Sequence, residues 1–365
     1  MRPASYRRSD LLRGPHIPDE LLLALPKADL LCHLDGALRV DTFRELRTAV
    51  GLEAPADDRE LLDRFFPLDG EHRHFADFFD HTTAALQTTE SLERVAREAG
   101  EDAHAQGCRY LELRFCPLRH MAEGLDADAA VAAVCTGLER AESETGIATG
   151  VIITGIRTIS PTASLELAEL AVRWKGRGVV AFDLAGQERD YPAKDHKRAF
   201  YLIMNNNLGA TIHAGEDFGP ASIHQALHYC GANRIGHGTR LHEDRDLLAY
   251  VNDQRIPLEM TLSSDLLTGV VDDLTGHPLR RYLDLGLRVT LNSDNPLFAR
   301  TNLSRELRLA VDTFDLTLLE TETILLNGFK SAFLPQQRKA ALIREVLGEF
   351  AALRDRFGLD DLELV

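Results

Sequence analysis

The chain has 365 residues, of which 44% are hydrophobic, and its 57 acidic and 41 basic side chains give a formal net charge of −16. This is the composition of a globular protein, and the length is sufficient for one large domain. An acidic surface repels nucleic acid and anionic membranes, so neither is an expected partner, whereas a small neutral substrate is compatible with it.

The chain contains five cysteines, scattered without a Cys-x-x-Cys pair, at Cys32, Cys108, Cys116, Cys135 and Cys230. An odd and dispersed set favours buried free thiols in a reducing compartment over a disulfide framework, so we expect a cytoplasmic protein. No apolar run approaches the ~18 residues that a membrane-spanning helix requires.

Short apolar strands alternate with helices along most of the chain. The first strand covers 27–36 and ends in a polar tip, and a helix follows over 38–50. The remaining expected strands are 109–115, 150–155, 179–184, 208–212, 234–237, 256–261 and 287–292, and the expected helices between them are 90–106, 126–144, 161–175, 193–207, 221–230, 243–252 and 277–285. Continuous apolar runs indicate parallel strands that are covered on both faces.

Residues 52–88 interrupt this alternation and hold Phe65, Phe66, Phe75, Phe78 and Phe79. We expect a helical insertion with an apolar face. It serves either as a lid over a planar ligand or as a helix pair packed on the body of the protein.

Eight strand–helix units predict a (β/α)8 TIM barrel. The alternative is a doubly wound open sheet, which calls for a Gly-rich phosphate-binding sequence after the first strand, and none is present there. We expect a single domain over residues 1–365. It comprises a barrel at about 27–300, the insertion at about 52–88 and C-terminal helices at about 303–357.

The unusual polar residues all follow the ends of predicted strands, where barrel enzymes place their active sites. They are His33 and Asp35, Asp183 and Gly186, His213 and Glu216, His237, and Asp294 and Asn295. Burying so many polar groups without partners is costly, so a structural explanation for the whole set is weak. Histidine and carboxylate side chains at successive strand ends predict a metal-dependent hydrolase site.

Several of these residues belong to motifs of a known family. Leu34-Asp35-Gly36, Phe182–Gly186, His213-Ala214-Gly215-Glu216, Arg234–Gly238 and Asn292-Ser293-Asp294 resemble, in order, the motifs of the adenosine deaminase family. The resemblance runs from about Pro26 to Pro296 and implies a zinc-dependent aminohydrolase on a (β/α)8 barrel. Such an enzyme replaces the 6-amino group of a purine nucleoside or related aminopurine with oxygen and releases ammonia. The sequence indicates no oligomeric state.

The resemblance also implies roles for individual residues. His33, His213 and Asp294 would be the metal ligands, a set of imidazole and carboxylate groups that suits Zn²⁺. Glu216 would carry a proton to the purine ring nitrogen N1. His237 would hold and orient the attacking water.

Three further residues would contact the substrate. By the same resemblance, Gly186 would offer its backbone N–H to the ring nitrogen N3, and Asp35 would accept a hydrogen bond from a ribose hydroxyl. Asn295 stands where the family often has a second aspartate that contacts the ring nitrogen N7. Its amide donates to that acceptor without first binding a proton.

One position departs from the family in a way that concerns the metal. The family carries His-x-His before Leu-Asp-Gly, whereas this chain reads Leu31-Cys32-His33. Neighbouring strand residues point to opposite faces, so Cys32 is expected to face the helix layer if His33 faces the barrel interior. The remaining two-histidine, one-carboxylate set with Asp294 also suits Fe²⁺.

Three functions therefore stay open. The first is a working adenosine or aminopurine deaminase. The second is a catalytically impaired purine-binding homologue that lost a metal ligand at Leu31. The third is an aminohydrolase of the same superfamily that acts on a modified purine.

Overall fold

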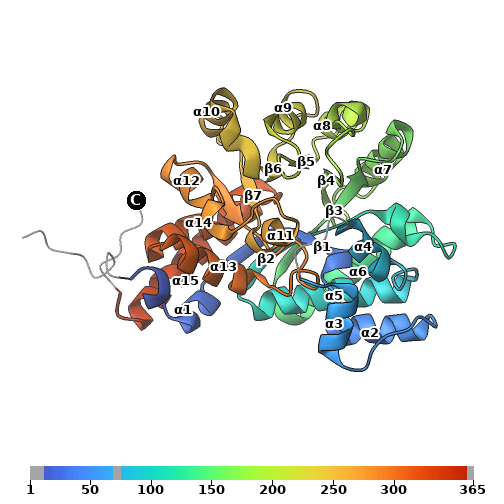
Figure 1. The fold of residues 1–365 in the computed structure, drawn as a ribbon, viewed down its shortest axis with the longest axis horizontal. Helices are drawn as coiled ribbons and strands as arrows, with labels where there is room; N and C mark the ends of the chain where they lie inside the picture. The colour runs from blue at the N-terminus through green and yellow to red at the C-terminus, as the bar shows by residue number, and fades with distance from the viewer. Residues whose placement is uncertain (1–11, 69–74, 360–365) are drawn as a thin grey trace, which may run out of the picture.

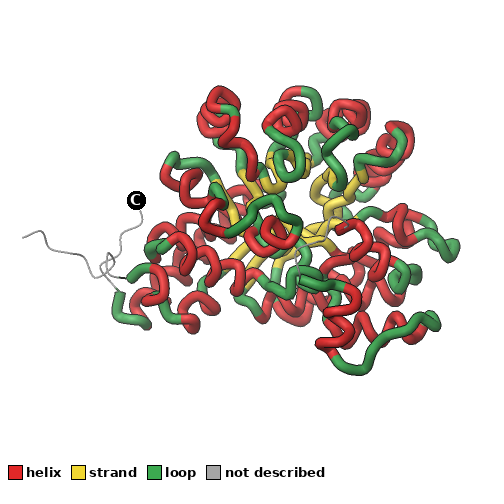
Figure 2. Tube along the Cα trace, in the orientation of Figure 1, coloured by secondary structure: helices red, strands yellow, loops and turns green. Residues whose placement is uncertain are grey.

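The computed structural model describes residues 12–68 and 75–359, and these form a barrel of eight parallel strands in sequential order, surrounded by helices (Figure 1). Figure 2 shows the strands gathered at the centre and the helices on the outside. The predicted (β/α)8 architecture is confirmed. The strands are β1 (Lys27–His33), β2 (Cys108–Phe115), β3 (Ala148–Ile156), β4 (Val179–Ala185), β5 (Gly209–Ala214), β6 (Arg234–His237), β7 (Leu258–Met260) and β8 (Val289–Leu291).

The helices fall into those of the barrel layer, those of the insertion and those at the C-terminus. They are α1 (Asp19–Ala24), α2 (Val40–Ala49), α3 (Asp58–Phe65), α4 (Phe75–Thr83), α5 (Thr89–Ala105), α6 (Ala127–Thr145), α7 (Pro161–Arg173), α8 (Lys197–Asn205), α9 (Pro220–His228), α10 (Arg245–Asp253), α11 (Leu262–Leu267), α12 (Leu279–Asp284), α13 (Leu303–Phe314), α14 (Leu318–Ser331) and α15 (Gln336–Arg356).

The barrel closes where the chain segment after β8 meets β1. The His33 N–H donates to the Asp294 carbonyl at 2.8 Å, and the Asp294 N–H donates to the Leu31 carbonyl at 2.8 Å. These two bonds hold a residue from the first strand and a residue from the last strand side by side, although 261 positions separate them in the sequence.

Local residue chemistry explains where several elements begin and end. Thr88 and Ser91 form a capping box at the start of α5, and Ser160 caps α7 just before a proline at its first position. The predicted strand 256–261 is shorter at both ends in the structure. Pro257 has no N–H to offer to a neighbouring strand, and Thr261 is the N-cap residue of α11. The polar tip 34–36, predicted as strand, instead forms a 3₁₀ turn, η3 (Leu34–Gly36).

The segment between α14 and α15 covers the end of the barrel away from the strand tips. Helix α14 packs against β8 and β1. Below it, Arg234 at the start of β6 donates to the Ser331 carbonyl at 2.9 Å, and its guanidinium lies 3.6 Å from the centre of the Phe333 ring. This closes the N-terminal end of the barrel and leaves the C-terminal strand ends for the polar residues.

The insertion packs on the body of the protein through an aromatic cluster. Phe66 is fully buried, and its ring stacks on Phe298 at 4.9 Å and meets Phe78 edge-on at 5.6 Å. A neighbouring ring, Phe79 of α4, lies edge-on to His33 at 5.7 Å. The packed interpretation of segment 52–88 therefore holds for the described residues, with 69–74 outside them, and the lid role stays a prediction.

The five cysteines are buried and unpaired, as predicted. Within the described residues, no helix is long and apolar enough to cross a membrane.

Candidate active site

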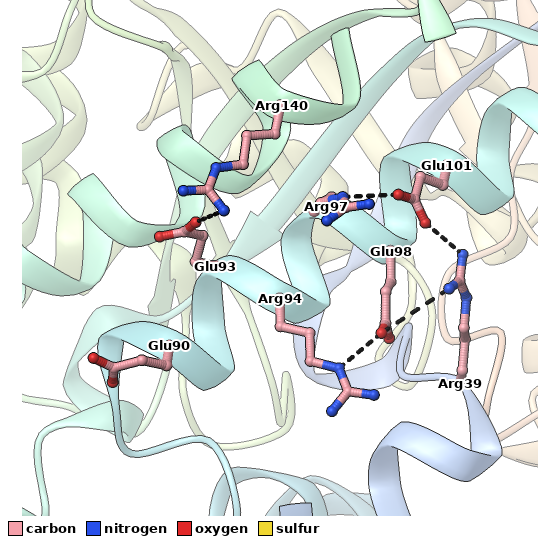
Figure 3. A pocket seen from close by; sticks show the side chains of 8 residues that line it. All are labelled: Arg39, Glu90, Glu93, Arg94, Arg97, Glu98, Glu101 and Arg140. Atoms are coloured by element: carbon pink, nitrogen blue, oxygen red, sulfur yellow. Dashed lines mark hydrogen bonds and ion pairs between the residues drawn. The ribbon is translucent and has the colours of Figure 1, made fainter. Parts of the chain in front are cut away.

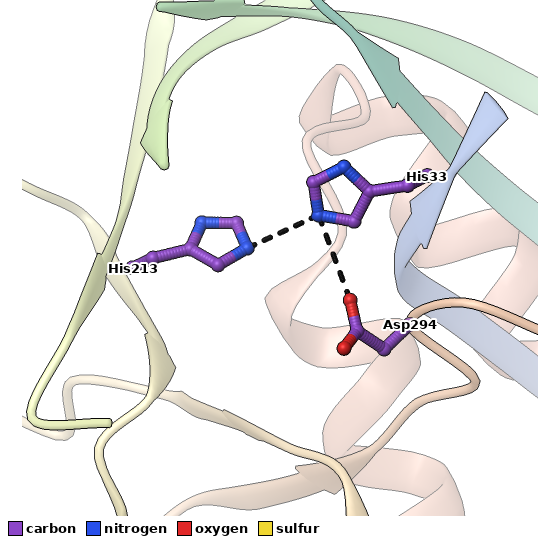
Figure 4. Close-up of side chains that lie close together, drawn as sticks. All are labelled: His33, His213 and Asp294. Carbon is purple, nitrogen blue, oxygen red and sulfur yellow. Dashed lines mark hydrogen bonds and ion pairs between the residues drawn. The ribbon is translucent and has the colours of Figure 1, made fainter. Parts of the chain in front are cut away.

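Three of the predicted site residues meet at the C-terminal end of the barrel. His33 ends β1, His213 lies near the end of β5, and Asp294 follows β8 (Figure 4). The two Nε2 atoms are 3.2 Å apart, and His33 Nε2 is 3.5 Å from Asp294 Oδ1. All three side chains are buried, and their ligand atoms lie within 4.8 Å of one another.

The proton positions on these rings fit a cation at this point. His213 Nδ1 lies 3.1 Å from the Asp183 carboxylate, which accepts only, so Nδ1 carries the proton and Nε2 presents a lone pair. Desolvation lowers the pKa of His33 to about 3, so its ring is neutral at neutral pH. An unprotonated Nε2 that faces another ring nitrogen and a carboxylate matches the donor set of a divalent metal ion.

Asp183 is held in place by groups inside the barrel. Arg114 donates to Asp183 Oδ2 at 3.2 Å and to Glu259 Oε2 at 3.0 Å, and all three side chains are fully buried. Burial by itself would raise the pKa of Asp183, but His213 and Arg114 hold it well below its usual range. The carboxylate therefore stays ionised and orients the His213 ring, a partnership typical of metal-binding histidines.

Glu216 and His237 lie next to this group. His237 Nε2 is 3.4 Å from Glu216 Oε2, and the His237 ring lies 5.2 Å from that of His213. Desolvation raises the pKa of Glu216 to about 8, so its carboxyl group holds a proton at neutral pH. Burial would lower the pKa of His237, but Glu216 and Asp265 raise it to about 10.

The loop that carries Glu216 is fixed by a residue that the sequence analysis did not single out. The buried Glu188 carboxylate accepts the N–H groups of Gly215, Glu216 and Asp217 at 2.9, 2.8 and 3.0 Å. Because Glu188 follows β4 by only a few residues, its place near a strand end was the signal that could have found it.

Asp265 is a second such residue. It accepts a hydrogen bond from His237 Nδ1 at 2.9 Å and is fully buried. Asp183 was identified as a strand-end residue but received no role. In both cases the missing information was a contact between strands, which sequence spacing does not give.

The predicted substrate-contacting residues lie around the same strand ends. Asp35 and Asn295 are both buried, and in neither does Oδ1 accept a hydrogen bond from the described residues. A Cβ at Gly36 would lie 2.1 Å from Asn295 Oδ1, so this close approach requires glycine. Gly186 is exposed at the end of β4 with φ +93°, which favours glycine and leaves its backbone open to a ligand.

Leu31 and Cys32 directly precede His33 in β1. Leu31 is fully buried, and its carbonyl oxygen accepts a hydrogen bond from the Asp294 N–H at 2.8 Å. Cys32 lines an outer cavity with Asp29 and Leu111, so it faces the helix layer as predicted. A register shift in β1 between Asp29 and Cys32 interrupts the regular alternation of its side chains.

A surface cavity of about 430 Å³ lies elsewhere, over α5, and Figure 3 shows its charged lining. Its arginines already pair with neighbouring carboxylates. The pairs are Arg39 with Glu101, Arg94 with Glu98, Arg97 with Glu101 and Arg140 with Glu93. The strand-end group is therefore the candidate active site.

A parallel barrel with imidazole and carboxylate groups converging at its strand ends defines a barrel hydrolase. A model of the family described as adenosine deaminase matches residues 26–348, and the chain belongs to this family.

Individual relatives agree with the match. Adenosine deaminase 1 of Streptomyces coelicolor is 40% identical over 350 residues, covering 90% of this chain and 88% of that protein. A probable adenosine deaminase of Dictyostelium discoideum is 36% identical over 329 residues, which are 89% of this chain but 43% of that protein. The crystal structure of an adenine deaminase from Arthrobacter aurescens superposes with a TM-score of 0.82 at 28% identity, covering 89% of this chain and 99% of that one. These matches support an adenosine deaminase-like aminohydrolase function.

Proposed function

We propose that the protein hydrolyses the 6-amino group of adenosine or a closely related aminopurine, and that this group of strand-end residues is its active site. The observation that carries the proposal is the adjacency of two sets of side chains. Glu216 and His237 lie directly beside the cluster of His33, His213 and Asp294. The first pair suits proton transfer and the second set suits a metal ion.

His33, His213 and Asp294 would hold one divalent cation, and zinc fits two imidazoles and a carboxylate. When bound, such a cation lowers the pKa of water and so supplies a nucleophile near neutral pH. The same ligands also suit Fe²⁺, so the identity of the metal is part of the proposal.

Glu216 and His237 act on the water and the purine ring. Glu216 gives its proton to the ring nitrogen N1, which prepares the carbon C6 for attack. His237 donates a hydrogen bond from Nε2 to the oxygen of the water and so orients it. A C–O bond forms at C6, the bond to the amino group breaks, and ammonia leaves with one proton that came from the water. The second proton of the water returns to Glu216, which restores its acid form.

Asp35, Gly186 and Asn295 hold the substrate. The unpartnered Oδ1 of Asp35 suits a hydroxyl donor such as that of ribose. The exposed backbone of Gly186 suits the ring nitrogen N3, and the Asn295 amide suits N7. These three contacts suit a neutral purine nucleoside or base as the substrate class.

Two other functions are each favoured by one observation. The likeness to an adenine deaminase favours the free base as the substrate. Leu31, which cannot bind a metal, favours a purine-binding protein with impaired catalysis.

One experiment separates these functions. The purified protein is analysed for bound zinc and iron. Its release of ammonia from adenosine and adenine is compared with its release of the substituted amine from N6-modified adenosines. Our proposal predicts bound metal and fastest release from adenosine. Fastest release from adenine or from a modified purine supports those substrates instead, and purine binding without metal or ammonia supports the impaired homologue.

A further inference from the structure

The Asp265 carboxylate accepts hydrogen bonds from four side chains, which come from three segments of the described chain. It lies in α11, just past β7, and is fully buried. Oδ1 accepts from His237 Nδ1 at 2.9 Å and from Thr261 Oγ1 at 3.1 Å. Oδ2 accepts from Thr239 Oγ1 at 2.7 Å and from His277 Nε2 at 3.0 Å.

The direction of each hydrogen bond follows from the neighbouring atoms. His277 Nδ1 accepts a hydrogen bond from the Leu279 N–H at 3.2 Å. The proton of this ring is therefore on Nε2, which donates a hydrogen bond to Asp265. Threonine hydroxyls donate readily to a carboxylate. A proton on Asp265 would displace one of these donors, so the group is ionised and accepts from all of them.

The hydrogen bonds of Asp265 also determine which nitrogen of the His237 ring faces it. Because Asp265 is an acceptor, His237 must carry a proton on Nδ1, and its ring cannot flip without losing that bond. The only ring nitrogen left for other partners is Nε2, which points toward Glu216 at 3.4 Å.

We propose that Asp265 is the positioning residue of His237: it keeps Nδ1 protonated and fixes the orientation of the ring so that the Nε2–H group faces the reacting water. His277, Thr239 and Thr261 in turn hold the carboxylate. This assignment rests on the proposed function, in which His237 orients the water, and it adds a residue outside the set that contacts substrate or metal.

Asp265→Asn tests the assignment because it retains the size of the side chain and removes the charge. An amide offers one acceptor atom, and its NH2 group opposes a donor, so neither the proton on Nδ1 nor the orientation of the His237 ring is enforced any longer. We expect kcat to fall by ~10²–10⁴-fold with KM for adenosine and bound metal unchanged. Asp272→Asn, at an exposed carboxylate on the same segment, is the matched control and should retain wild-type kcat.

A proton NMR signature tests the contact without relying on turnover. Wild-type protein with 15N-labelled histidine should show a downfield N–H resonance from His237 Nδ1, assigned by its loss in His237→Gln and its persistence in His277→Gln. Asp265→Asn should remove or shift this resonance. The proposal is overturned if the folded wild type lacks the resonance, or if Asp265→Asn leaves both the resonance and kcat unchanged. A wild type that shows the resonance but releases no ammonia contradicts the proposed function and leaves the positioning contact established.

Discussion

At the scale of single residues, the site depends on groups whose protonation is set by their surroundings. Desolvation raises the pKa of Glu216 to about 8, whereas desolvation keeps His33 neutral by lowering its pKa to about 3. The first shift makes a proton donor available at neutral pH, and the second frees a lone pair for a metal ion. Glu216 thus takes the opposite of the charge state that is usual for a carboxyl group at neutral pH, whereas His33 stays neutral even under mildly acidic conditions.

Glu216→Gln should leave the metal bound and lower turnover by ~10²–10⁴-fold, because the amide cannot give a proton to the purine ring. Ammonia release and metal content are the measurements. The wild-type rate should fall as the pH rises through about 8, where the acid form of Glu216 is lost. Asp217→Asn, on the exposed neighbour in the same loop, is the control. A Glu216→Gln variant with more than about a tenth of wild-type activity contradicts the role.

Asn295→Asp should weaken purine binding more at high pH than at low pH. A carboxyl group donates to the ring nitrogen N7 only while protonated, whereas the amide of Asn295 donates at any pH. The affinity for inosine, measured by calorimetry across a pH series, reports this without turnover. Asn205→Asp, at an exposed position, is the control. An effect independent of pH would mean that residue 295 does not face the ring nitrogen.

At the scale of elements, the insertion is tied to the barrel by stacked aromatic rings. Phe66 of the segment after α3 contacts Phe298 of the segment after β8, and Phe79 of α4 reaches His33. Removing a ring from this cluster therefore affects how the insertion sits against the strand ends.

Phe66→Ala should lower the free energy of unfolding by ~3–5 kcal/mol, since it removes a fully buried ring and leaves a cavity. Denaturant unfolding measures the loss. Tyr201→Ala removes an aromatic ring that is 65% exposed, and it should change stability by no more than about 0.5 kcal/mol. A Phe66 variant as stable as the control would show that the insertion contributes nothing to the folded barrel.

The sequence predicted most elements and the strand-end location of the site because apolar runs and polar tips are local features. It did not predict the role of Asp265, which lies in a short helix beyond the expected end of the strand 256–261. Its contacts with His237 and His277 cross from one strand unit to others. For the same reason the contacts of Glu188 and Arg114 were not predicted. The orientation of Cys32 was predicted because it alternates with its neighbour His33, beyond the register shift in β1.

At the scale of the whole molecule, barrel closure brings together the ligands of the proposed metal site. The bonds between β1 and the segment after β8 place Leu31, His33 and Asp294 together, and β5 brings His213 across the barrel. Any change at Leu31 therefore acts at the seam that joins the two ends of the barrel.

Leu31→His should increase the affinity for zinc at least ~10–100-fold. Substitution of residues that only hydrogen-bond to metal ligands already changes metal affinity by this factor, and a new metal–nitrogen bond should have a larger effect. Zinc titration against a competing chelator measures it. Cys32→His adds the same ring one residue later on the face toward the helix layer, so it should leave zinc affinity unchanged. Equal affinities of the wild type and Leu31→His would place Leu31 away from the metal.

The central claim is that this barrel deaminates adenosine with a metal ion held by His33, His213 and Asp294. The most direct test is the rate of ammonia release from adenosine by the purified protein, measured before chelation, after removal of bound metal and after re-addition of zinc. We predict release at the start, its loss on chelation and its recovery with zinc. Absence of ammonia release from the folded, zinc-supplemented protein, or release that persists after complete removal of the metal, would contradict the claim.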